Sequence, residues 1–233
     1  MNVRDLGGHC TEDGVETRYG AVVRADDLTR LSEAGWEALR AYPVRRIIDL
    51  RWAGERDTEH DASVDVVHIP LFGDRNERHD ADRELLERVP DHVECRRLMY
   101  LAHLDLYPER FADALEAVTS AKGCVVVHCA GGIDRTGLVS ALLLRLAGVS
   151  REDAAADFGL SRGNWAPFVG EWINGAEDDR EREFRRFLAA MPDAAMLGVL
   201  AELDRSYGGA EGYLRDAGVP AETLRRARAK LRP

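Results

Sequence analysis

A cysteine followed by a short glycine-containing loop and an arginine is the feature of this sequence best suited to do chemistry. In the stretch VVVHCAGGIDRTG, Cys129 ends an apolar run, Gly131 and Gly132 follow, and Arg135 comes six residues after the cysteine. The backbone N–H groups of such a loop can face inward and bind an anion. A helix beginning near Thr136 adds the positive end of its dipole. A thiol at the base of this loop is stabilised as the thiolate, which is the nucleophilic form of cysteine.

The same loop can hold a tetrahedral oxyanion above the sulfur. Arg135 offers a planar, permanently charged fork for two of its oxygens. These residues predict attack of the Cys129 sulfur on phosphorus, followed by hydrolysis of the phosphocysteine by water. Asp134 is placed to protonate the leaving oxygen and then to activate the water, and the Thr136 hydroxyl is predicted to hydrogen-bond the sulfur. We interpret His128 as a structural residue that holds the loop, not as a base.

Strands and helices alternate along the chain before and after this loop. Asp13-Gly14 marks a tight turn, so residues 19–24 are predicted to be the returning strand of a hairpin. Short apolar runs predict further strands at 44–51, 64–69 and 124–128. Helices are predicted at 32–39 after a Ser32 cap, at 98–120 as two helices divided at Pro108, at 136–146, after Ser150, and from 177 onward with breaks near Pro192, Gly208 and Gly218.

This order of elements predicts the α/β fold class, with a central, mostly parallel sheet flanked by helices and with extra C-terminal helices. We expect a single domain over residues 1–233, with an N-terminal hairpin at about 1–30 and a helical C-terminal part at about 176–233. Charge dominates residues 74–95, which are predicted to be a loop with one short helix.

Ligands of such sheets bind at the carboxyl ends of the strands, where Asp49, Arg51 and Cys129 are predicted to lie. Asp49 and Arg51 could orient the loop, or Arg51 could touch substrate. We favour an ion pair that ties the Arg4-Asp5 segment to the sheet. Asp74 follows the next strand and is the second candidate for the general acid, after Asp134.

Composition limits the partners and the compartment. The net charge of −10 argues against a nucleic-acid surface. Lysine occurs only at 122 and 230, so most positive groups are arginines, which suit carboxylates and phosphates. No apolar run approaches the ~20 residues that span a bilayer, and the N-terminus lacks the apolar region of a signal peptide. We therefore expect a cytoplasmic protein with no stable membrane association.

The four cysteines fit neither a zinc site nor a disulfide framework; they are Cys10, Cys95, Cys124 and Cys129. No cluster at metal spacing is present in the sequence, so neither a metal nor another cofactor is expected. Cys124 could be the resolving thiol that reacts with an oxidised Cys129. Its position in a strand instead predicts that Cys124 is a core residue.

The loop also carries a family resemblance. His128-Cys129, five residues and Arg135-Thr136 match the signature of cysteine-dependent phosphatases. Three further features point to one family among these phosphatases: the Asp directly before the Arg, the N-terminal NVRDLGG and the central IDLR. With them the chain resembles the atypical bacterial tyrosine phosphatase family. Its members act on phosphotyrosine, and in some cases on phosphoserine, phosphothreonine or phosphoinositides.

The resemblance implies a role for each loop residue. It makes Cys129 the nucleophile, Arg135 the phosphate clamp and Asp134 the general acid. The amide cradle would be formed by Ala130, Gly131, Gly132 and Ile133. The family usually has lysine where this chain has Ile133, and loss of that cation should weaken binding of multiply phosphorylated lipid head groups most.

The sequence therefore predicts a metal-independent phosphomonoester hydrolase that acts through a phosphocysteine. The expected substrate is protein phosphotyrosine, in a phosphoprotein or phosphopeptide, and dual specificity stays open. Alternatives are a phosphoinositide phosphatase and a non-catalytic phosphate-binding member of the same fold. Sulfur transfer and arsenate reduction also use a cysteine in an anion loop, but the Asp-Arg-Thr ending argues against them.

Overall fold

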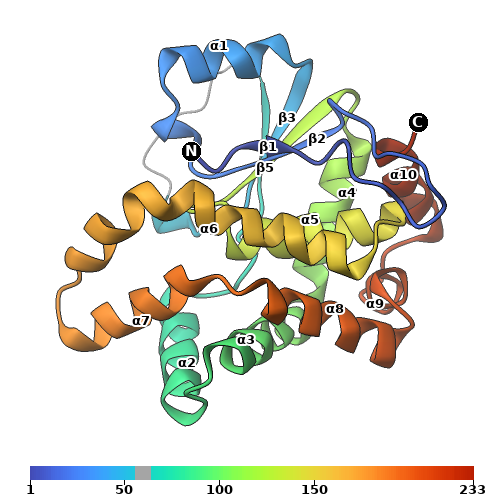
Figure 1. Ribbon diagram of the computed structural model, residues 1–233. Coiled ribbons are helices and arrows are strands. Elements are labelled where there is room, and N and C mark those ends of the chain that lie inside the picture. Colours follow the sequence, from blue (N-terminus) through green and yellow to red (C-terminus); the bar gives the residue numbers. More distant parts are fainter. Residues whose placement is uncertain (56–63) are drawn as a thin grey trace.

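The computed structural model describes residues 1–55 and 64–233, and in this part of the chain the strands form one sheet. Its five strands run in the order β1-β2-β5-β3-β4. The N-terminal hairpin pairs β1 (Arg4–Asp5) antiparallel to β2 (Val22–Ala25). The other neighbours are parallel: β2 with β5 (Cys124–His128), β5 with β3 (Val44–Asp49), and β3 with β4 (Asp65–His68). The predicted α/β fold with a mostly parallel sheet is confirmed (Figure 1).

The two faces of the sheet are covered by different helices because side chains alternate along each strand. On one face Cys124 and Val126 of β5 pack with residues of α1 (Glu33–Ala41). On the other face Val125 and Val127 join a larger core. That core contains residues of α4 (Pro108–Ser120), α5 (Asp134–Ala147) and α10 (Ala221–Leu231). Cys124 is thus a core residue, as predicted.

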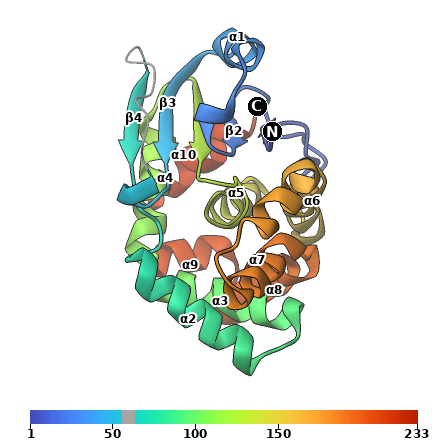
Figure 2. The same ribbon diagram turned by 90° about the vertical axis from the view of Figure 1, so that its left-hand side faces the viewer.

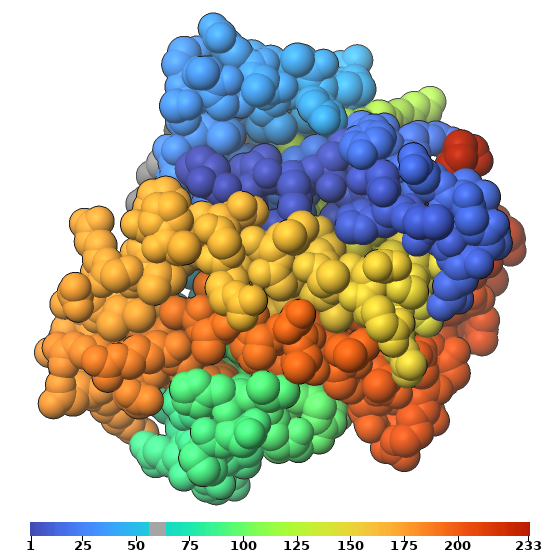
Figure 3. Space-filling model, in the orientation of Figure 1, coloured from blue at the N-terminus to red at the C-terminus, as the bar shows by residue number. Residues whose placement is uncertain are grey.

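The remaining helices form a second layer beyond α5 (Figure 2). This layer contains α2 (Arg75–Arg88), α3 (His92–Leu106), α7 (Asp179–Ala190), α8 (Asp193–Tyr207) and α9 (Ala210–Asp216). The long helix α6 (Arg151–Asn174) packs against α5, α7 and α8. The N-terminal residues, dark blue in Figure 3, lie directly against α6. Within α5 every residue except Asp134 and Arg145 is buried, so this helix is the centre of the molecule.

Two predicted boundaries were wrong. The stretch 74–95 is not a loop with one short helix, because α2 runs for 14 residues and α3 already begins at His92. Asp74 and Asp91 cap these two helices through side-chain hydrogen bonds. In addition, α5 starts at Asp134 and not at Thr136.

Other predicted boundaries are confirmed. Ser32 and Ser150 cap α1 and α6, and Pro108 is the first residue of α4.

Among the described residues, no helix has the length and apolar character needed to cross a membrane.

Candidate active site

The loop between β5 and α5 is held by hydrogen bonds to its outward-facing carbonyl groups. The Asn2 side-chain amide donates to the carbonyls of both Gly131 and Gly132, at 3.0 Å each. Trp165 Nε1 of α6 donates to the Gly131 carbonyl at 2.9 Å. Arg24 Nη2 of β2 donates to the Gly132 carbonyl at 2.8 Å. Donors from three distant segments therefore fix the orientation of these two peptide groups.

The fixed carbonyls turn the loop amides toward the opposite side. The Ala130 carbonyl also points outward, where it accepts a hydrogen bond from the Asp27 N–H at 3.1 Å. Gly132 has φ +63°, and a Cβ there would lie 2.6 Å from the Ala25 carbonyl oxygen, so only glycine fits. Within the described chain, the N–H groups of residues 131–133 donate to no protein acceptor. They are free to bind an anion, as the sequence predicts for this loop.

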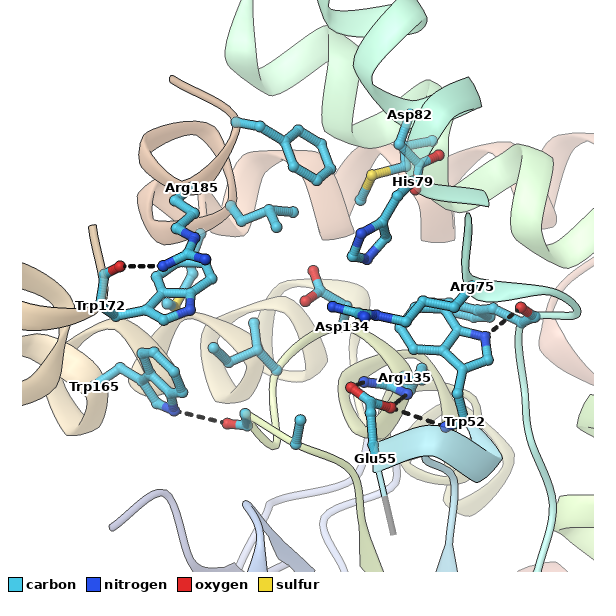
Figure 4. Close-up of a pocket in the computed structure, with 18 of the residues that line it drawn as sticks. Trp52, Glu55, Arg75, His79, Asp82, Asp134, Arg135, Trp165, Trp172 and Arg185 are labelled. Atoms are coloured by element: carbon cyan, nitrogen blue, oxygen red, sulfur yellow. Dashed lines mark hydrogen bonds and ion pairs between the residues drawn. The ribbon is translucent and has the colours of Figure 1, made fainter. Parts of the chain in front are cut away.

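A cavity of about 400 Å³ opens at this loop. Its floor includes the loop residues Ala130, Gly131, Ile133, Asp134 and Arg135. Cys129 precedes them in the chain, is 2% exposed and is not among the residues that line the cavity. Figure 4 shows Trp165 and Trp172 on one side of the cavity and Trp52, Arg75 and Arg135 on the other. The walls are rich in aromatic rings; they include Trp52, Phe72, His79, His103, Trp165, Trp172 and Phe184.

The guanidinium of Arg135 is held end-on by Glu55 (Figure 4). Nη1 and Nη2 donate to the two carboxylate oxygens at 2.6 and 3.1 Å, and the Trp52 ring stacks 4.2 Å from the guanidinium carbon. Burial alone would lower the pKa of Arg135, but Cys129 and Glu55 raise it. The pairing leaves Nε–H and one Nη2–H of Arg135 available for a phosphate.

Asp134 is oriented by two buried donors of α3. Its Oδ1 accepts hydrogen bonds from Arg96 Nη1 and from the Tyr100 hydroxyl, at 2.6 Å each. Burial raises the pKa of Tyr100 well above its usual range, so the phenol stays protonated and donates. Arg96 also binds the carbonyls of Phe187 and Leu188 at the end of α7. Oδ2 of Asp134 is therefore the oxygen left to exchange a proton with a substrate.

Asp49 and Arg51 form a buried pair behind the loop. Arg51 Nε and Nη2 each lie 3.0 Å from a carboxylate oxygen of Asp49, and Nη1 binds Asp27 at 2.9 Å. Burial would raise the pKa of Asp49, but hydrogen bonds from Arg51 and the charge of His128 lower it. His128 Nε2 lies 3.7 Å from Asp49 Oδ1. The predicted ion pair between this site and the Arg4-Asp5 segment was wrong, because Arg51 forms its ion pairs with Asp49 and Asp27.

The structure also differs from the expectations for Asp74, the second candidate for the general acid, and for the Thr136 hydroxyl. Asp74 accepts hydrogen bonds from the N–H groups of Asn76 and Glu77 at the start of α2, and it does not line the cavity. It is a helix cap and not a second acid at the loop. The Thr136 hydroxyl is fully buried and has no hydrogen-bond partner in the described chain, so the predicted bond to the Cys129 sulfur is not formed.

Several residues of the site were not found from the sequence. Three contacts come from remote segments: Arg24 binds the loop, Arg96 and Tyr100 bind Asp134, and Glu55 binds Arg135. Glu55 follows the carboxyl end of β3, a position where ligand-binding residues are common, and this was the one available signal. The described residues contain no group of three or more side chains that could hold a metal ion.

Comparison with known proteins agrees with this geometry. The model of the tyrosine phosphatase family matches residues 1–233. The chain belongs to this family. A tyrosine-protein phosphatase of Nostoc commune is 30% identical over 231 residues, covering 91% of this chain and 74% of the relative. The triple specificity protein phosphatase PtpB of Mycobacterium tuberculosis is 27% identical over 279 residues, covering 99% of each chain. Family membership confirms the predicted resemblance and the predicted enzyme class, a protein-tyrosine phosphatase that hydrolyses phosphoric monoesters.

Proposed function

We propose that this enzyme hydrolyses phosphotyrosine in protein substrates through a phosphocysteine formed on Cys129. The observation that carries the proposal is the loop itself. Three successive carbonyls are tied outward, so the intervening amides face the cavity together with the guanidinium of Arg135. This arrangement binds a phosphate dianion above the sulfur of Cys129 and stabilises the charge of the transition state.

In the first step the sulfur of Cys129 attacks phosphorus while the bond from phosphorus to the tyrosine oxygen breaks. The loop amides and the free N–H groups of Arg135 hold the three non-bridging oxygens. Asp134 donates a proton from Oδ2, so the product leaves as a neutral phenol. Glu55 keeps Arg135 in place during this step through the bidentate pair.

In the second step water attacks the phosphocysteine. Asp134 now accepts a proton from the water as the sulfur–phosphorus bond breaks, and the thiolate of Cys129 is regenerated with release of inorganic phosphate. Arg96 and Tyr100 hold the same oxygen of Asp134 in both steps, so the carboxyl group keeps the same orientation toward the substrate.

The cavity walls favour an aryl phosphate. Trp52, Phe72, Trp165 and Trp172 supply flat apolar surface on which a tyrosine ring can pack between the mouth and the loop. The relative PtpB is named for triple specificity. We therefore include phosphoserine and phosphothreonine as slower substrates of this chain, since they reach the same loop without filling the aromatic walls.

A substrate panel tests the proposal. Phosphotyrosine, phosphoserine and phosphothreonine peptides, phosphoinositides, arsenate and thiosulfate are each given to the wild type and to Cys129→Ser. We expect phosphate release to be fastest from phosphotyrosine and absent in Cys129→Ser. Cys10→Ser, which alters an exposed cysteine, is the matched control and should retain full turnover. Peptide binding without phosphate release, or preferred turnover of arsenate or thiosulfate, would contradict the proposal.

A further inference from the structure

Behind the phosphate loop lies a cluster of buried charges that the mechanism above does not use. Arg24 is 0% exposed; its Nη1 binds the carboxylate of Asp157, and its Nη2 binds the Gly132 carbonyl. Arg4 Nε binds the other oxygen of the same carboxylate at 2.8 Å. Asp157 lies in α6 and is itself 2% exposed. Two guanidinium groups therefore share one carboxylate directly behind the loop.

The cluster carries an excess of positive charge. Arg4 and Arg24 form no ion pair with a second carboxylate in the described chain, and both reach the Ser161 hydroxyl, at 3.2 and 3.4 Å. His9 Nε2 lies 3.8 Å from Asp157 and adds to the excess whenever it is protonated. Because Arg24 and Asp157 are buried, solvent and salt screen the charge of Arg24 weakly.

Arg24 lies beside the loop that carries the nucleophile: β2 pairs with β5, where Arg24 is opposite Val127, and Arg24 Nη2 binds the Gly132 carbonyl at 2.8 Å. Burial lowers the pKa of Arg24, Asp157 opposes this most strongly, and Cys129 also raises it. The attraction is mutual, so a cation favoured by a neighbouring thiolate favours that thiolate in return. Arg135 is likewise attracted to Cys129, which raises the pKa of Arg135, but the charge of Arg135 is matched by Glu55.

We propose that Arg24 is a positioning residue that stabilises the Cys129 thiolate from behind the loop, and that Asp157 limits the strength of this effect. The inference rests on the proposed role of Cys129 as the nucleophile. Arg24 acts in two ways. Its hydrogen bond to Gly132 turns a loop amide toward the phosphate, and its charge attracts the sulfur.

Most of the other charged groups around the loop are paired with one another. Asp26, at the end of β2, is 1% exposed, and burial raises its pKa toward the neutral form. Three further groups of charges are paired: Asp49 and Asp27 with Arg51 and His128, Glu55 with Arg135, and Asp134 with Arg96. Arg30, in the segment after β2, lines the cavity and lies over the rings of Trp165 and Phe168, so its charge is the same in every variant tested.

The test is the pH dependence of Cys129 alkylation by iodoacetamide, measured by peptide mass spectrometry in a Cys10→Ser background. Arg24→Met should move the pH midpoint of the reaction up by about one unit, so alkylation below the midpoint becomes roughly tenfold slower. Asp157→Asn should move it down, because it removes a negative charge. Arg24→Lys should keep the midpoint close to that of the wild type.

Both substitutions disturb the packing behind the loop, so a purely structural effect would move the two alkylation midpoints in the same direction. Midpoints that move in opposite directions therefore indicate an electrostatic effect. Arg46→Met is the matched control: Arg46 binds Asp65, the Ala117 carbonyl and Ser120 away from the loop, so its loss should leave the midpoint unchanged. If Asp157→Asn does not fold, Arg4→Met replaces it, and a smaller upward shift than in Arg24→Met supports the proposal.

Midpoints that stay unchanged, or that move the same way in Arg24→Met and Asp157→Asn, would overturn the inference. Such a result leaves phosphate release by the wild type intact. Failure of the proposed function is a separate result, in which Cys129→Ser retains turnover whatever happens at Arg24.

Discussion

At the scale of single residues, two acidic side chains at the cavity floor have different tasks. Asp134 is held by Arg96 and Tyr100 through one oxygen, which leaves the other free for proton transfer. Glu55 uses both oxygens on Arg135 and has none to spare for a substrate. The hydrogen-bond pattern thus separates a proton donor from a group that orients the phosphate clamp.

Asp134→Asn should slow the release of poor leaving groups and spare activated aryl phosphates. The amide cannot donate an acidic proton, and general acid catalysis contributes roughly 10²–10⁴-fold. The measurement is kcat/KM across a series of aryl phosphates of increasing leaving-group acidity. Asp74→Asn, which affects only a helix cap, should show no such trend; a trend in that variant would contradict the assignment.

Glu55→Gln should lower kcat/KM for phosphotyrosine peptides roughly tenfold, about 1.4 kcal/mol of transition-state stabilisation. Glutamine keeps the shape but not the charge that holds Arg135 end-on. Burial would raise the pKa of Glu55, but Arg135 lowers it, so the carboxylate stays ionised in the pair. A rise in activity would instead show that Glu55 competes with phosphate for the guanidinium.

At the scale of elements, α6 links the N-terminal segment to the loop. Its Asp157 binds Arg4 and Arg24, and its Trp165 reaches the Gly131 carbonyl. The loop that does the chemistry is therefore held by a helix that follows it in the chain and by a hairpin that begins the chain. Helix α6 contributes to loop geometry as well as to the cavity wall.

Trp165→Phe should reduce kcat roughly fivefold, because a loop carbonyl loses one donor, worth about 1 kcal/mol. Trp172→Phe is the matched control, since Trp172 lines the same cavity and its ring nitrogen donates no hydrogen bond in the described chain. Steady-state kinetics with one phosphotyrosine peptide compare the two variants. Equal losses in both would show that Trp165 acts through packing alone.

The elements differ in how far the sequence predicts them. β3, β5 and α5 were predicted because their apolar runs are short, buried and bounded by turn residues. The length of α2 was underestimated, as one short helix within a loop, because α2 is almost wholly polar, with Asp82 as its one buried residue, and has no apolar periodicity. Its start is marked only by the Asp74 cap.

The residues of the site also differ in how far the sequence predicts them. Cys129, Asp134 and Arg135 are close in sequence, so their chemistry can be predicted from spacing. Glu55 binds Arg135 across 80 residues, and Asn2 binds the loop across 130. Contacts of this range depend on the packing of whole elements, and no local pattern encodes them. Arg51 was assigned the wrong partner for a different reason, because its main partner, Asp49, lies only two residues away in the sequence.

At the scale of the whole molecule, buried thiols link stability to alkaline pH. Burial raises the pKa of Cys95 to about 11 and that of Cys124 to about 12. Keeping these thiols neutral stabilises the fold fully below the ordinary thiol pKa of about 8.5, and this stability is lost as the pH rises toward the raised values.

The free energy of unfolding should therefore fall above about pH 8.5, and each buried thiol adds a slope of about 1.4 kcal/mol per pH unit. Cys124→Ala should remove its share of the slope, whatever it does to stability at neutral pH. Urea unfolding between about pH 8 and 10.5 measures the slope. Cys10→Ser, at an exposed thiol, should leave it unchanged, and an unchanged slope in Cys124→Ala would refute the linkage.

Trapping the covalent intermediate tests the role of Cys129 directly. A phosphotyrosine peptide is mixed with the wild type and with Asp134→Asn, the reaction is quenched in acid within one turnover, and the digested protein is analysed by mass spectrometry. We expect phosphate on the peptide that carries Cys129, and on no other cysteine peptide. Phosphate release without a phosphorylated Cys129, or turnover that survives in Cys129→Ser, would contradict it.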